Sequence, residues 1–209
     1  MNTAVWVPAI YILFAGVFKQ MFFPELSMGW QIGIGVVLTW LAVLVNVVTL
    51  DVGKWVPNLG AILKVIIFLA IIAGSFAHMQ DHGMANPLSF ETLKPDWSQS
   101  AQYIPAIIYG MLGFELVSAG SEEMQDPARD VPRSIFISGV IIILLYLLGT
   151  IAVLAAIPAG DINLVEGLID TLSLFFGDSA AGEAFVLALG IGALYTFFSN
   201  GVTWALGCN

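Results

Sequence analysis

The sequence is short of charge and of cysteine, and each shortage excludes a class of protein. Only 10% of its 209 residues are charged, against roughly a quarter in a soluble domain, and 59% are hydrophobic. Six Lys and Arg against fifteen Asp and Glu leave no basic surface, so we expect no nucleic-acid partner. The single cysteine, Cys208, excludes an internal disulfide and a multi-cysteine metal site.

Histidine is equally scarce, and this argues against an enzyme. His78 and His82 are the only two, and neither belongs to an HExxH motif. They stand four residues apart in HMQDH, a spacing that would suit a metal if the segment were helical. We interpret the segment as a solvated loop, since no further histidine completes a site. We therefore expect no catalytic residue, metal site or cofactor.

Long apolar runs are abundant, and the mean hydropathy is +0.93. A membrane helix needs about 20 apolar residues, whereas a barrel strand needs about 10 alternating ones. The runs therefore predict an all-α, multi-pass membrane protein with a single domain over residues 1–209. The predicted spans are 4–23, 29–50, 55–77, 100–121, 134–157 and 184–206, with outer loops 78–99 and 158–183 and an inner loop 122–133.

Several residues predict how these spans pack. Glycines 29, 33 and 35 suit close helix contact. Asn46 could join helices by hydrogen bonds or belong to a site, and the Ser199–Asn200 pair could join helices or line a pore; we favour the joining role for both. The short turn 51–54 predicts that the spans beside it are antiparallel neighbours. Apolar spacing over 164–176 predicts a helix too short to cross the membrane, which we expect at the surface.

The fourth span is interrupted at Tyr109–Glu115, which includes Gly110 and Gly113. Two glycines at mid-depth are tolerable only where protein or a wet cavity surrounds the helix. A carboxylate there costs about 2.5–3.5 kcal/mol, which makes a functional site the default hypothesis. We therefore predict a helix break that lines a cavity.

Lys64 is the second ionisable residue at membrane depth, near the middle of the third span. It should point into the bundle, because an ammonium in hydrocarbon is costly. Two interpretations stay open: a structural lysine paired with a carboxylate or carbonyls, or a group that mimics an ion or handles protons.

Lys and Arg placement predicts the orientation. The links 51–54 and 122–133 hold Lys54, Arg129 and Arg133, so both are expected in the cytoplasm. Nine acids then lie outside or at that rim: Glu25, Asp81, Glu91, Asp96, Asp161, Glu166, Asp170, Asp178 and Glu183.

The string GFE in the broken span, followed by EEMQDPARDVPRSI, resembles the sixth helix and the next cytoplasmic loop of amino acid–polyamine–organocation (APC) transporters, particularly their glutamate/GABA antiporter-like branch. The six spans are similar in order to the third to eighth helices of that family. The resemblance implies part of a LeuT-like bundle built from a five-plus-five inverted repeat. It also implies a bacterial inner-membrane location.

The resemblance assigns roles to particular residues. It implies a substrate-binding and gating segment formed by Tyr109, Gly110, Met111, Leu112, Gly113, Phe114 and Glu115. It implies coupling roles for Lys64 and Glu115. It also implies cytoplasmic gating and topology roles for Glu123, Pro127, Arg129, Pro132 and Arg133.

The resemblance therefore implies secondary transport of an amino acid or related amine, by exchange or with protons, within a longer parent chain. The chain begins and ends inside apolar runs, which fits such a parent. The alternative is a membrane scaffold or an inactive truncated transporter, in which Lys64 and Glu115 only pair with each other or with a partner helix.

Overall fold

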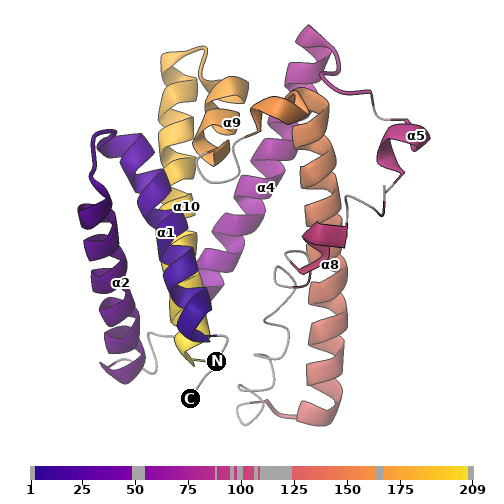
Figure 1. Cartoon of the computed structure of the whole chain (residues 1–209). Coiled ribbons are helices and arrows are strands. Elements are labelled where there is room, and N and C mark those ends of the chain that lie inside the picture. The colour runs from indigo at the N-terminus through magenta and orange to yellow at the C-terminus, as the bar shows by residue number, and fades with distance from the viewer. Residues whose placement is uncertain are drawn as a thin grey trace.

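The computed structural model describes residues 3–48, 55–87, 89–94, 97, 101–105, 108, 124–162 and 167–206. Every regular element in these residues is a helix (Figure 1). The long helices are α1 (Thr3–Phe22), α2 (Met28–Val48), α4 (Trp55–His82), α8 (Pro127–Ala156) and α10 (Ala180–Leu206). The shorter elements are α5 (Phe90–Leu93), α9 (Gly167–Phe176), and 3₁₀ turns at Ala101–Tyr103 and Ala159–Asp161.

Five of the six predicted spans thus correspond to long helices, and the fourth lies largely outside the described residues. Four helices are long and apolar enough to cross a membrane: Met28–Val47, Trp55–His82, Pro127–Ala156 and Ala180–Ala205. In α1 the described apolar stretch, Val7–Phe22, is shorter.

Two helices run further than the predicted spans. α4 includes the HMQDH segment, because nothing in it breaks a helix before Gly83, which adopts a φ of 79°. The Gly83 N–H donates to the Met79 carbonyl at 2.9 Å, which is a typical helix end. Expecting a loop from His78 onward was therefore wrong.

α8 begins at Pro127, so residues 127–133, expected as a loop, form its first two turns. Proline fits the first helical position, where its missing N–H costs nothing. The Asp126 carbonyl accepts hydrogen bonds from the N–H groups of Arg129 and Asp130, at 3.1 and 2.8 Å. Because of these hydrogen bonds, the helix begins at Pro127, before the apolar run that starts at residue 134.

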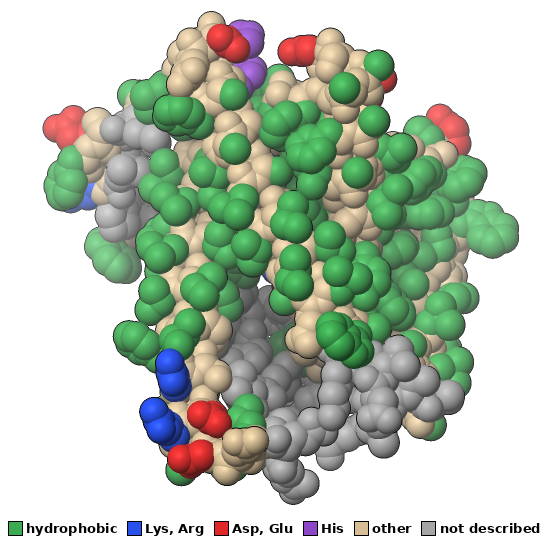
Figure 2. All heavy atoms as spheres, turned by 180° about the vertical axis from the view of Figure 1, so that it is seen from behind, with side chains coloured by type: hydrophobic (Ala, Val, Ile, Leu, Met, Phe, Trp, Pro, Cys, Tyr) green, Lys and Arg blue, Asp and Glu red, His purple; other side chains and the backbone are tan. Residues whose placement is uncertain are grey.

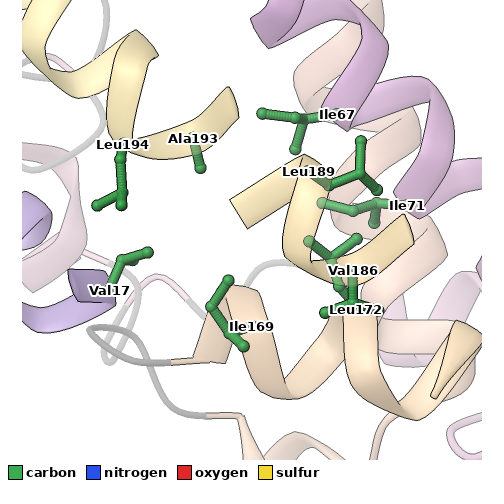
Figure 3. Close-up of a cluster of buried hydrophobic side chains, with 9 residues drawn as sticks. All are labelled: Val17, Ile67, Ile71, Ile169, Leu172, Val186, Leu189, Ala193 and Leu194. Atoms are coloured by element: carbon green, nitrogen blue, oxygen red, sulfur yellow. The ribbon is translucent and has the colours of Figure 1, made fainter. Parts of the chain in front are cut away.

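α10 is the central helix, packing against α1, α2, α4 and α9. The main core cluster lies around it, with side chains from four helices pointing toward one another (Figure 3). Its buried members are Val17 from α1, Ile67 and Ile71 from α4, Ile169 and Leu172 from α9, and Val186, Leu189, Ala193 and Leu194 from α10. A second cluster joins α1, α2 and α10 through Val7, Ile10, Tyr11, Ala42, Val202 and Trp204.

Contacts along the helices give their directions. The tilted rings of Phe68 and Tyr146 lie with their centroids 5.9 Å apart, and the Ser75 hydroxyl donates to the Ala152 carbonyl at 2.6 Å. Both pairs advance along the chain together, so α4 and α8 run in the same direction. This is what the predicted alternation of loops requires of helices that both start on the cytoplasmic side.

Candidate functional site

The predicted helix break, Tyr109–Glu115, lies outside the described residues, and so does Glu123. The described site residues are Lys64 on α4 and Pro127, Arg129, Pro132 and Arg133 on α8. The structure therefore describes no contact between the predicted helix break and the other site residues.

Along α4, Lys64 lies one turn after a residue that contacts α10 and one turn before a residue that contacts α8. Residues four apart share a face of a helix, and Gly60, Lys64 and Phe68 form one such row. Gly60 lies against Ser199 of α10, and Phe68 packs on Gly149 and Tyr146 of α8. The helix geometry thus sets Lys64 on the side of α4 that faces α8 and α10.

The Lys64 side chain is itself exposed, although the neighbouring turns Gly60 and Ile67 are buried. Among the described residues, no carboxylate or other side chain forms an ion pair or hydrogen bond with it. No described partner therefore explains why a lysine stands at membrane depth, and both interpretations of its role stay open.

The polar side chains of α2 and α10 bond neighbouring helices. Asn46 Nδ2 donates to the carbonyl oxygens of Ala42 and Val202, at 3.0 and 3.1 Å, which ties α2 to α10. The Ser199 hydroxyl donates to the Val56 carbonyl of α4 at 2.9 Å. The prediction that Asn46 and Ser199 join helices is confirmed.

Tyr11 is a buried polar residue that the sequence reasoning did not single out. Its side chain is 1% exposed, and its hydroxyl lies against Gly201 of α10 without a hydrogen-bond partner in the described part of the chain. The signal in the sequence was a tyrosine inside an aliphatic run. Buried hydroxyl groups are usually hydrogen-bonded, so the Tyr11 hydroxyl is an exception within the otherwise apolar contact between α1 and α10.

Within the part of the chain that the structure describes, a cavity lies between α1 and α2 and another between α4 and α8, and both are lined mainly by apolar side chains. The larger, about 450 Å³, lies between α1 and α2 and is lined by Tyr11, Ile12, Gly35 and Val36 among others. The smaller, about 360 Å³, lies between α4 and α8 beside Phe68 and Gly149. Among the described residues, neither lining includes Lys64 or a carboxylate, so these residues do not offer the charged groups that would hold a zwitterion or an amine.

Charged side chains gather at the two ends of the molecule. Arg129 and Arg133 are exposed in the first turns of α8, next to Asp126 and Asp130. Figure 2 shows basic and acidic side chains together at one end, histidines with acids at the other, and a broad hydrophobic surface between. Apolar helices between two charged ends define an integral membrane protein of the helical class.

The comparisons with known proteins give the family. The family model described as "Amino acid permease" matches residues 1–209, so the chain belongs to the amino acid permease family of APC transporters. It is 26% identical over 209 residues to a probable agmatine/putrescine antiporter of Lactococcus lactis subsp. lactis (strain IL1403), covering all of this chain and 44% of that protein.

Two other relatives agree. An uncharacterized transporter of Legionella pneumophila subsp. pneumophila (strain Philadelphia 1) is 26% identical over 179 residues, which cover 82% of this chain and 38% of that protein. The branched-chain amino acid permease of Bacillus subtilis (strain 168) is 28% identical over 107 residues, which cover 50% of this chain and 22% of that protein. No solved structure gives a significant match. The chain thus spans less than half the length of each relative, and its family is one of transporters, not enzymes.

Proposed function

We propose that this chain is the part of a secondary transporter that corresponds to the third to eighth helices of the APC fold. The transporter moves an amino acid or related amine by alternating access, as an exchanger or with protons. The family match over all 209 residues carries this proposal. The parallel course of α4 and α8 supports it, because the order of spans requires that direction.

The chemistry of the substrate follows from two sources. The relatives' names cite agmatine, putrescine and branched-chain amino acids, which all carry an amino group. A broken helix at Tyr109–Glu115 suits an amino group, since carbonyls at the end of one half-helix attract an ammonium. For an amino acid, N–H groups at the start of the next half-helix would also attract its carboxylate. The glutamate/GABA antiporter-like branch stays a prediction.

Lys64 and Glu115 are the proposed coupling groups. A charged side chain at membrane depth costs less in a wet, open state than in a dry, occluded one. Uptake or release of a proton at either residue would therefore shift the balance between the two states. The position of Lys64 on the side of α4 that faces α8 and α10 is compatible with this role.

Counterflow in proteoliposomes tests the proposal on the full-length protein that contains this chain. Vesicles are loaded with one unlabelled amino acid, agmatine or putrescine, and uptake of the labelled compound is compared with protein-free vesicles. We expect saturable, trans-stimulated uptake for at least one compound. Uptake equal to that of empty vesicles for the whole panel would favour the scaffold alternative.

Variants then test the coupling groups. We expect Lys64→Ala and Glu115→Gln each to reduce coupled uptake by about tenfold or more, as removal of an interaction worth about 1.4 kcal/mol or more would. Lys94→Ala is the matched control, because Lys94 is exposed in the link after α5. Unchanged rates and unchanged pH dependence in both test variants would overturn the coupling roles without affecting the transport assignment.

A further inference from the structure

We propose that Arg129 and Arg133 of α8 bind the phosphate of an anionic phospholipid, with the ring of Phe136 against the lipid's acyl chains. The site lies where α8 begins. It depends neither on the substrate nor on the coupling roles of Lys64 and Glu115.

The length of α8 sets these residues at the surface of the membrane. Its 30 residues measure about 45 Å at 1.5 Å per residue. The hydrocarbon core of a bilayer is only about 30 Å thick. The apolar run of α8 begins after Arg133, so the first two turns lie outside the hydrocarbon. Arg133 is therefore at the level of the lipid headgroups, and Phe136 lies just inside the apolar layer.

The three side chains share the face of α8 that points away from the described bundle. Arg129, Arg133 and Phe136 are spaced by four and three residues, which places them on one side of a helix. All three are exposed, and Phe136 is 73% exposed. Val131 and Ile135, on the opposite side, are half-buried. Figure 2 shows basic side chains at this end on the outer flank of the molecule, with acidic side chains beside them.

The two arginines are unpaired, and the helix itself does not explain them. Within the part of the chain that the structure describes, neither forms an ion pair or a hydrogen bond, although Asp126 and Asp130 are near in sequence. Acids suit a helix start, where the helix dipole is positive, whereas cations oppose it. Asp126 and Asp130 thus stabilise the start of α8, and Arg129 and Arg133 do not. An anion outside the helix would offset this unfavourable placement.

Charge and depth together select a lipid phosphate. The planar guanidinium group matches a phosphate with two parallel hydrogen bonds, and two such groups stand one turn apart. Anionic lipids hold their phosphates at the headgroup level, which is the level of Arg133. Phe136 adds apolar contact that a lipid with acyl chains uses and a free phosphate ion does not. We therefore expect a lipid, not a soluble anion.

Thermal unfolding in mixed micelles tests the site on the full-length protein that contains this chain. The midpoint is followed while phosphatidylglycerol replaces phosphatidylcholine at constant total lipid. We expect phosphatidylglycerol to raise the midpoint of the parent. The double variant Arg129→Gln with Arg133→Gln should need about tenfold or more of this lipid for the same rise, because charge-assisted hydrogen bonds are lost. Lys94→Gln is the matched control, since it removes one exposed cation elsewhere, and it should respond like the parent.

Two further variants separate a defined site from general positive charge. Arg129→Lys with Arg133→Lys keeps both charges, and with them the signal that orients the helix, but loses the paired hydrogen bonds. Phe136→Ala keeps both arginines and loses the contact with the acyl chains. We expect both variants to need more phosphatidylglycerol than the parent. A full parental response in the lysine variant would overturn a site of this geometry.

The remaining outcomes identify other occupants. Inorganic phosphate added to phosphatidylcholine micelles should leave the midpoint of the parent unchanged, and a rise equal to that with phosphatidylglycerol would overturn the choice of a lipid. A midpoint that the double glutamine variant lowers equally in both lipids would show that the arginines bind another segment of the protein. An equal response of the parent and the double glutamine variant to phosphatidylglycerol would overturn the proposal.

Discussion

Single residues without side chains set the closest approaches in the bundle. A Cβ added at Gly60 of α4 would clash with the side chain of Ser199 on α10, and one added at Gly201 would clash with the Tyr11 ring. At Gly190 the clash would be with Met21 of α1. α10 can therefore approach α1 and α4 closely only because these positions are glycine.

Gly60→Ala tests the approach of α4 to α10, with Gly33→Ala as the matched control. Alanine favours a helix over glycine by up to about 1 kcal/mol, which applies to both variants. Nothing lies within 4 Å of a Cβ at Gly33, so we expect no loss there. At Gly60 we expect a loss of about 1–3 kcal/mol from overpacking, seen as a lower thermal midpoint in detergent. Equal midpoints for the two variants would show that the contact does not limit packing.

The sequence predicted the hydrogen bonds between helices better than it predicted which glycines lie at close helix contacts. Asn46 and Ser199 bond across helices as expected, because a buried amide or hydroxyl must find a partner. Glycines 29, 33 and 35 were expected at close helix contacts. Gly35 does lie against α1, where an added Cβ would be 3.8 Å from Tyr11, but an added Cβ at Gly29 or Gly33 meets no other described helix within 4 Å. A glycine allows a second helix to pack closely, but the sequence does not show whether another helix packs at that position.

Among the elements, α9 differs most from its prediction. The apolar spacing predicted a helix there, and the structure has one, but it does not lie on the surface alone. Ile169, Thr171 and Leu172 are buried, and α9 packs against α1, α4 and α10. Gln20 of α1 also donates a hydrogen bond to Asp170 at 2.5 Å. The helix thus contributes to the core, whereas the sequence predicted a helix at the surface.

Leu172→Ala tests this role, and Leu174→Ala is its control on the same helix. Leu172 is fully buried, whereas Leu174 is 44% exposed. We expect Leu172→Ala to lower the free energy of unfolding by about 2–5 kcal/mol, because a cavity remains in the core. Leu174→Ala should cost much less. Similar losses, measured by thermal unfolding in the same detergent, would contradict the buried position of α9.

The pairing of α2 with α4 shows a limit of loop length as a guide. The short link 51–54 predicted that the two helices pack side by side. Instead α10 packs against both, and they make little contact with each other. The prediction failed because α10, which begins at Ala180, packs against the faces of α2 and α4 that could have met. The local sequence around residues 51–54 carries no information about that distant helix.

At the scale of the molecule, the apolar runs correctly predicted five long helices, and four of these are long and apolar enough to cross a membrane. The ends of α4 and α8 were missed, since backbone hydrogen bonds at Gly83 and Asp126 place them, not hydrophobicity. Of the candidate site, the structure describes Lys64 and the first turns of α8. The helix break at Tyr109–Glu115 stays a prediction.

The central claim is that α8 and α10 start on opposite sides of the membrane, with the Arg129–Arg133 turns of α8 inside and the end near Asp178, where α10 begins, outside. Two single cysteines in a Cys208→Ser background test it. Ala128→Cys lies in the first turn of α8, and Ser179→Cys lies just before α10, both at exposed positions.

The measurement is labelling of intact cells with a membrane-impermeant maleimide, before and after permeabilisation. We predict labelling of Ser179→Cys in intact cells and labelling of Ala128→Cys only after permeabilisation. Labelling of both positions from the same side would contradict the arrangement of the bundle. The reverse pattern would contradict its orientation.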